Sequence, residues 1–332
     1  MKIVFSLAPV LLFLVSLYLL DSFKLVSRNI LIICLLWGII AALISYFLNT
    51  WLVRHFSLNF NLFSRYLAPI TEEITKAMVV LYLISRQKIG FAIDAAIYGF
   101  AAGAGFALAE NVVYLVLLKN DPTLIIWILR GFGTALMHGG CTALVAMLVI
   151  GGIQREKPMI LAISSGLLAA FLLHSIFNHF FVSPYLQTAL IFIVLPIVFA
   201  IVFKQSTTVL QNWLEIEFST EIELLRMIKQ GKLRGTKAGE YLVKMKQHFA
   251  PETILDLYCY LSLYLELSIK AKRNLMLKEN GFPVVVEPEI IDKLNELKQL
   301  RRQIGKMGEL AIQPLVRMKH RDLWELNLLR NI

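Results

Sequence analysis

Cysteine is scarce in this chain, which has three among its 332 residues: Cys34, Cys141 and Cys259. They lack the spacing of a metal site, and they imply no disulfide framework. The sequence also contains no glycine-rich nucleotide loop, no Cys/His cluster and no internal repeat. These absences exclude a disulfide-stabilised small domain and argue against a nucleotide-binding enzyme or a repeat protein.

Charged residues are also few, at 17% of the chain, and they are unevenly distributed. Residues 1–204 contain 13 of the 33 Lys and Arg residues and 7 of the 23 Asp and Glu residues. The remainder lies in 205–332, at the density of an ordinary soluble domain. Because this tail mixes both signs, the net charge of +10 indicates a membrane surface as the partner and no nucleic acid.

The chain is correspondingly rich in apolar residues: 58% of it is hydrophobic and the mean hydropathy is +0.67. We expect an all-α fold, with a polytopic membrane helix bundle in residues 1–204 and a soluble helical domain in residues 205–332. About seven spans are expected, at roughly 3–20, 30–48, 69–85, 91–118, 123–150, 159–182 and 185–203. The first lacks a small-x-small cleavage site before Asp21, so we expect it to remain uncleaved.

Lys and Arg residues concentrate in the first, third and fifth expected loops and after Lys204. Positive loops favour the cytoplasmic side, so the C-terminal domain is expected in the cytoplasm and the N-terminus outside. The chain is thus predicted to be a multi-pass integral membrane protein embedded in a lipid bilayer. Its C-terminal domain would bind a cytoplasmic partner, sense a cytoplasmic signal, or only stabilise the membrane part.

Charges occur where a membrane helix is expected to carry none, at Glu72, Glu73 and Lys76, shortly after Pro69. A charge at mid-membrane costs ~2.5–3.5 kcal/mol on insertion scales. A helix places Lys76 within reach of either carboxylate, and the other acid would then be free for chemistry or for a metal. The alternative is an interfacial ion pair at a helix end.

Further polar residues lie inside expected spans: Glu110, Asn111, His138, His174 and Asn178. Counted from the outer helix ends at about 1.5 Å per residue, Glu73, Glu110, His138 and His174 reach one level, roughly 6–15 Å from the non-cytoplasmic face. Independent structural residues have no reason to share a depth. The sequence therefore predicts one shared site.

Helical spacing decides which neighbours join this site. His174 and Asn178 lie on one helical face, so Asn178 could orient the imidazole or bind a substrate oxygen. His179 lies further round the helix and is expected outside the cluster. Asp94 and Arg130, near helix ends, are expected to be interfacial anchors or a structural pair.

Carboxylates and imidazoles in a partly dry pocket support two routes to amide hydrolysis. Two histidines and a carboxylate can bind a divalent metal such as Zn²⁺ and leave a position for water, with His138, His174 and Glu110 as the candidate ligands. Alternatively, a buried Glu activates water directly while His and Asn stabilise the oxyanion. The same residues would also suit a proton or cation pathway.

With these residues in view, the chain resembles the PrsW family of intramembrane proteases, which are distant relatives of the CAAX prenyl endopeptidases and the Abi proteins. The resemblance rests on four motifs in register within residues 66–182: Glu72-Glu73-x-x-Lys76, Phe106-x-x-x-Glu110-Asn111, His138, and His174-x-x-x-Asn178. Compared with the CAAX enzymes, Lys76 replaces a later arginine and Glu110 replaces a histidine, so prenyl-protein processing is not expected.

The resemblance implies a membrane-embedded endopeptidase of metallo- or glutamate type in the bacterial inner membrane. It would cut a membrane-anchored protein, such as an anti-sigma factor, near the outer face. Our hypothesis makes Glu73, with or without Glu72, the general base, and pairs Lys76 with the other carboxylate. His138 and His174 would bind metal or the oxyanion, Glu110 would be a ligand or orienter, and Asn178 would hold the substrate carbonyl. The alternative function is a proton or ion transporter, a channel, or a non-catalytic scaffold.

Overall fold

The computed structural model describes residues 1–57, 59–118, 123–233, 235–284, 287–316 and 320–329. Within these ranges every regular element is helical, which confirms the predicted all-α class. The chain divides into two compact units, Met1–Thr207 and Thr208–Ile332. We describe each unit separately.

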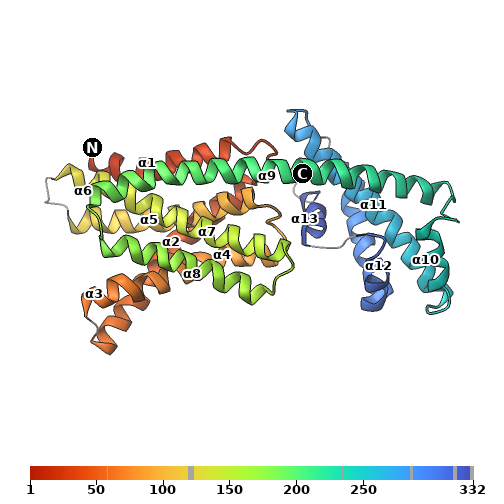
Figure 1. Cartoon of the computed structure of the whole chain (residues 1–332), viewed down its shortest axis with the longest axis horizontal. Helices are drawn as coiled ribbons and strands as arrows, with labels where there is room; N and C mark the ends of the chain where they lie inside the picture. Colours follow the sequence, from red (N-terminus) through yellow and green to blue (C-terminus); the bar gives the residue numbers. More distant parts are fainter. Residues whose placement is uncertain (58, 119–122, 234, 285–286, 317–319, 330–332) are drawn as a thin grey trace. The chain divides into compact units, whose positions relative to one another are not determined.

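The helices of the first unit lie side by side with their long axes roughly aligned (Figure 1). They are α1 (Lys2–Leu19), α2 (Arg28–Phe56), α3 (Phe60–Leu62), η1 (Phe63–Leu67), α4 (Ala68–Ser85), α5 (Ala92–Leu117), α6 (Leu124–Leu129), η2 (Arg130–Thr134), α7 (Ala135–Gln154), α8 (Met159–His179) and α9 (Pro184–Lys229), which continues into the second unit. Among the described residues, six helical runs are long and apolar enough to cross a membrane: α1, α2, α5, Leu124–Gln154, α8 and α9.

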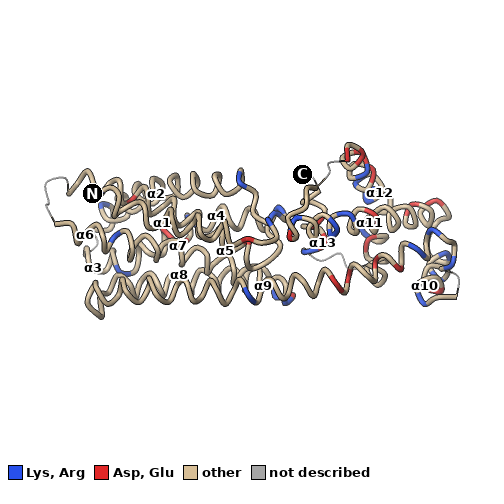
Figure 2. Tube along the Cα trace, turned by 90° about the horizontal axis from the view of Figure 1, so that it is seen from above, with Lys and Arg blue, Asp and Glu red and all other residues tan. Residues whose placement is uncertain are grey.

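The helix α4 is absent from that group of six because Glu72, Glu73 and Lys76 lower its hydropathy. It nevertheless packs against α2, α5, α7 and α8. The tube in Figure 2 shows how little charge the first unit carries compared with the second. The expected polytopic bundle is therefore confirmed, and its charged helix lies among apolar ones.

The start of α4 corrects one expectation. In the sequence, the stretch 54–68 is too polar to extend the third expected span, which predicts a broken start at Pro69. Instead α2 continues to Phe56, and a nearly continuous helical run starts at Phe60 and passes through η1 into α4. The segment η1 is a π-helix, in which the Ala68 N–H bonds to the Phe63 carbonyl five residues earlier. Such segments in helices are frequent at functional sites.

The helix α5 packs closely between α2 and α7 because its surface is made of small residues. A Cβ atom on Gly103 would collide with the His138 carbonyl of α7, and one on Gly105 would collide with the Leu35 carbonyl of α2. Small residues let membrane helices approach closely. This close packing brings Glu110 on α5 near His138 on α7.

Asp94 begins α5 rather than pairing with Arg130. Its carboxylate accepts the backbone N–H groups of Gly90, Phe91 and Ala95, at 2.8, 2.8 and 3.1 Å. The N–H groups of Gly90 and Phe91 precede the first turn and so lie outside the hydrogen bonds between successive helical turns, whereas the Ala95 N–H also bonds to the Phe91 carbonyl. Of the two expectations for Asp94 and Arg130, the structural pair is wrong, because Asp94 caps the first turn of α5 and Arg130 contacts Glu110.

The second unit contains the last part of α9 with α10 (Lys237–Met245), α11 (Pro251–Glu279), α12 (Glu289–Ile312) and α13 (His320–Leu328). Gly231 and Gly281, with φ of 66° and 73°, follow the ends of α9 and α11, as glycines do after helices. Gly239, by contrast, lies inside α10. A kink that the sequence did not reveal occurs at Gly305, inside α12.

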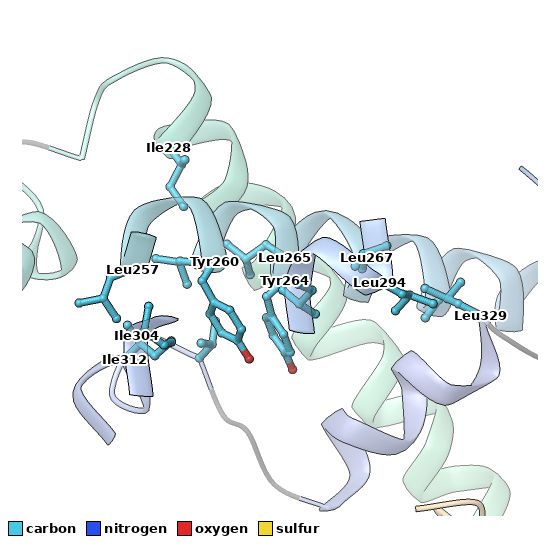
Figure 3. Packing of buried hydrophobic residues seen from close by; sticks show 14 of the residues in the cluster. Ile228, Leu257, Tyr260, Tyr264, Leu265, Leu267, Leu294, Ile304, Ile312 and Leu329 are labelled. Atoms are coloured by element: carbon cyan, nitrogen blue, oxygen red, sulfur yellow. The ribbon is translucent and has the colours of Figure 1, made fainter. Parts of the chain in front are cut away.

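The core of this unit is built on α11, whose Tyr260 and Tyr264 rings point to the same side (Figure 3). The helical spacing of apolar residues in the sequence predicts one stripe over Tyr258, Leu261, Leu265 and Ile269. Of these, Leu261 and Leu265 are fully buried. Tyr258 is 37% exposed, so the buried face is rotated from the predicted one. The rotation brings Ser268 and Lys272 into the interior, where Lys272 meets carboxylates.

Candidate functional site

The helix α4 carries a buried ion pair. Lys76 Nζ donates to Glu73 Oε1 at 2.6 Å, and the two side chains are 0% and 1% exposed. The structure thereby answers which carboxylate the lysine neutralises. The hypothesis from the sequence makes Glu73 the general base and pairs Lys76 with the other carboxylate. Instead Glu73 is the paired acid, and Glu72 is the acid that remains accessible, at 17% exposure.

His138 on α7 lies between two charged groups. Its Nδ1 is 3.0 Å from Lys76 Nζ, and its Nε2 is 3.2 Å from Glu110 Oε2. A protonated lysine has only donors, so beside it Nδ1 accepts and the ring proton lies on Nε2, facing Glu110. Phe106, from the same motif as Glu110, places its ring 4.9 Å from Lys76 Nζ and 5.0 Å from the His138 ring.

In His174 on α8, the ring proton and the lone pair are on the opposite nitrogens from those in His138. Its Nδ1 is 2.7 Å from Glu73 Oε1, and an ionised carboxylate can only accept. The ring proton therefore lies on Nδ1, and the lone pair of Nε2 faces Glu72 Oε2 at 3.8 Å. The His138 and His174 rings are perpendicular, with centroids 4.9 Å apart. The two imidazoles thus present one N–H and one lone pair to the same small region.

Glu110 is held by Arg130, a residue the sequence analysis placed outside the site. Arg130 Nη2 is 3.2 Å from Glu110 Oε2, its Nε donates to Asn111 Oδ1 at 2.9 Å, and its guanidinium lies 3.6 Å from the Tyr114 ring centroid. Its place close after Thr123 suggested a helix end. However, the helical run continues through η2, which turns Arg130 toward α5. Its separation of eight residues from His138, about two helical turns on one face, was the available signal.

The two asparagines of the motifs do not face this region. Asn111 Nδ2 donates to the Ser6 carbonyl of α1 at 2.7 Å, and Asn178 Nδ2 donates to the Ser64 carbonyl of η1 at 2.9 Å. Both side chains satisfy backbone carbonyls of neighbouring helices. His179 contacts Ser175 O and the Tyr66 hydroxyl, outside the cluster as expected.

Among the residues that the structure describes, one group of three side chains could hold a metal ion. The candidate ligand atoms of Glu72, His138 and His174 all lie within 4.8 Å of one another. Two imidazoles and a carboxylate form a donor set of catalytic zinc sites. The Glu73 carboxylate behind His174 supplies the hydrogen bond that usually orients a metal-binding histidine. The sequence pattern predicts Glu110 as the third ligand beside the two histidines, whereas the structure brings Glu72 together with both.

The bundle is all-helical, and it gathers carboxylates, imidazoles and a lysine among its apolar helices. These features define an integral membrane protein with an enzyme-like site. Residues 26–203 match the sequence profile of the PrsW family, described as intramembrane metalloproteases. The match covers more than half of the chain, so the chain belongs to this family and the predicted resemblance is confirmed. It is an intramembrane protease, a peptidase whose substrate is a membrane-embedded protein. No curated protein and no solved structure is significantly similar to it.

Proposed function

We propose that the chain hydrolyses a peptide bond in a membrane-anchored protein at the region between Glu72, His138 and His174. One observation carries the proposal: Glu72 is partly exposed and faces the free lone pair of His174, while the neighbouring Glu73 is fully buried and paired with Lys76. A carboxylate with an accessible oxygen next to an imidazole lone pair can hold a water molecule and take its proton.

The other residues prepare this arrangement. Lys76 balances the charge of Glu73, so Glu72 is the acid of the pair that remains available. Glu73 fixes the His174 ring through Nδ1. The Nε2–H group of His138 faces Glu110. It can donate its hydrogen bond to the oxygen of an attacked carbonyl instead, and so stabilise the charge that develops there. Arg130 neutralises Glu110 and keeps it beside His138.

The same region fits a divalent cation, which Glu72, His138 and His174 would hold. The donor set supports this, as does the Glu73 hydrogen bond to His174. A bound cation supplies a more acidic water and polarises the carbonyl. Glu72 would then act as a ligand, and His138 would bind through Nε2 as a neutral imidazole: its Nε2 proton would pass to the adjacent Glu110 carboxylate while Nδ1 takes a proton from Lys76.

Topology and depth extend the proposal. The distribution of Lys and Arg supports a cytoplasmic C-terminal domain, and the depth of the site residues counted from the outer helix ends supports a cut near the outer face of the membrane. The family resemblance supports the bacterial inner membrane and an anti-sigma-type factor as the substrate. In the proposed organisation, residues 1–204 form the protease bundle and residues 205–332 form a soluble domain that recognises a cytoplasmic partner.

Glu72→Gln tests the proposal. Membranes containing the wild-type chain, the Glu72→Gln variant or the control Glu215→Gln would be compared by mass spectrometry of newly formed protein N-termini. Glu215 is an exposed carboxylate of α9 in the second unit, so its variant should resemble the wild type. We expect cleavage products with the wild type and the control that disappear with Glu72→Gln. Equal products in all three, or ion flux into liposomes without any cleavage, would overturn the proposal.

A further inference from the structure

The turn of helix that precedes the candidate site lacks one of its own hydrogen-bond donors. Pro69, which has no N–H, stands four residues after Arg65 and five after Ser64. The Ala68 N–H, the other possible helical partner of the Ser64 carbonyl, bonds to Phe63 instead. The π-segment η1 therefore presents backbone carbonyls that α4 does not satisfy. In a bilayer, such groups need a partner within the protein.

The helix α8 provides the missing donors. Ser175 Oγ donates to the Arg65 carbonyl at 2.7 Å, and Asn178 Nδ2 donates to the Ser64 carbonyl at 2.9 Å. Ser175 is 5% exposed, so its hydroxyl is committed to this contact. Ser164, on the same helix, instead bonds to its own Ile160 carbonyl, as serines in membrane helices commonly do.

The residue next to Ser175 is His174, whose Nδ1 contacts Glu73. One turn of α8 therefore binds the chain at two levels, at the carbonyls before Pro69 and at the carboxylate four residues after it. Because a helix turn contains 3.6 residues, Glu73 lies about one turn beyond Pro69. The bonds to the η1 carbonyls fix the rotation and height of α4 relative to α8, and these decide how Glu73 meets His174.

We propose that Ser175 and Asn178 are positioning residues: they bind the carbonyls that Pro69 leaves unsatisfied and so hold Glu72 and Glu73 in register with His174. The amide of Asn178 thus serves the backbone of η1 rather than the substrate carbonyl. The structural part of this proposal stands on the hydrogen bonds alone. Its consequence for catalysis rests on the proposed function of Glu72.

A double-mutant cycle tests the structural part without any substrate. Pro69→Ala restores an N–H that can bond to the η1 carbonyls, so Ser175 should matter less in its presence. We expect Ser175→Ala to lower the melting temperature of the full chain in detergent by about 2 °C, and by clearly less in the Pro69→Ala background. The matched control Ser164→Ala should give the same small change in both backgrounds. Equal losses from Ser175→Ala with and without Pro69 would overturn the proposal.

The cleavage rate tests the catalytic part, on a product identified with the wild-type chain. Ser175→Ala should lower kcat by up to about 100-fold at little change in KM, since small displacements of reacting groups have such effects. Ser175→Thr keeps the hydroxyl and should restore most of the rate. A cycle that succeeds with kcat unchanged would overturn the positioning role in catalysis. Absence of cleavage by the wild type would count against the proposed function and leave the result of the cycle intact.

Discussion

Glu73 and Lys76 form an ion pair at 2.6 Å from which solvent is almost completely excluded. Two further contacts complete it, since His174 Nδ1 binds the same carboxylate oxygen and His138 Nδ1 faces the ammonium group. Burying two charges is costly unless geometry and additional hydrogen bonds compensate. Here both imidazoles of the candidate site serve as those compensating groups. The pair therefore orients the candidate site as well as neutralising its helix.

Removing one member of this pair should destabilise the chain. Glu73→Gln leaves the Lys76 ammonium buried without its counter-ion, at an expected cost of about 3–5 kcal/mol. The double variant Glu73→Gln with Lys76→Met removes both charges and should recover a large part of the loss. Thermal unfolding in detergent measures both. A single variant as stable as the wild type would contradict the role of the pair.

Arg130 should affect catalysis through Glu110. Arg130→Gln removes the cation that holds Glu110 beside His138, and loss of such supporting contacts typically costs about 10- to 100-fold in activity. Arg155→Gln, in an exposed turn after α7, is the matched control and should leave the rate unchanged. Initial rates of cleavage compare the two. An Arg130→Gln variant with the wild-type kcat would remove this residue from the site.

A divalent cation should copurify with the chain at close to one per molecule. Elemental analysis of the wild type, Glu72→Gln, His174→Ala and Glu215→Gln would measure it. Glu72→Gln and His174→Ala remove ligands of the candidate group and should abolish retention of the cation, whereas Glu215→Gln should not. Chelation should stop cleavage and zinc should restore it. Full activity of demetallated protein would assign the chemistry to Glu72 acting as a general base without metal.

The close contact between α5 and α7 should tolerate no larger residue. A side chain at Gly103 meets the backbone of His138 and Gly139, so Gly103→Val should force the helices apart at a cost of about 1–3 kcal/mol and reduce cleavage. Gly151→Val is the control for volume, because a Cβ at Gly151 meets nothing within 4 Å. Equal melting temperatures of the two variants would contradict the close-packing role of Gly103.

The second unit should lose stability as pH rises. Burial raises the pKa of Glu325 well above its ordinary value, although Lys272 lies 3.2 Å away and acts in the opposite direction. The folded state therefore binds a proton that the unfolded state releases near pH 4.5, and this contribution to the free energy of unfolding falls as pH rises from there toward the raised pKa.

Glu325→Gln should weaken this pH dependence. Hydrogen exchange of α11 and α13 peptides in the full chain, at pH 5 and pH 8, would measure it after correction for the intrinsic exchange rate. We expect the ratio of protection between the two pH values to be smaller in the variant than in the wild type. An unchanged ratio would show that Glu325 does not titrate differently in the folded chain.

Composition and spacing were sufficient for the class of fold and for most of the polar side chains that the structure brings together at the candidate site. Long apolar runs can only be satisfied by helices in a bilayer, so the sequence specified the bundle and most helix positions. A charged side chain inside a membrane helix is energetically costly, so such residues usually have a functional or structural role. This cost identified Glu72, Glu73, Lys76 and Glu110 as candidates. The same argument failed for Arg130, since a charge near an apparent helix end has an ordinary interfacial explanation.

The tertiary structure decided the pairing. Lys76 lies within helical reach of both Glu72 and Glu73, so spacing could not determine which acid it neutralises. That choice depends on which side chain faces α7 and α8, where His138 and His174 complete the pair. Asn178 likewise shares a helical face with His174, yet it bonds to Ser64 because Pro69 leaves that carbonyl open. Local sequence thus determined which groups are present, and helix packing determined their partners, because hydrogen bonds between helices depend on rotation and height that no single helix specifies.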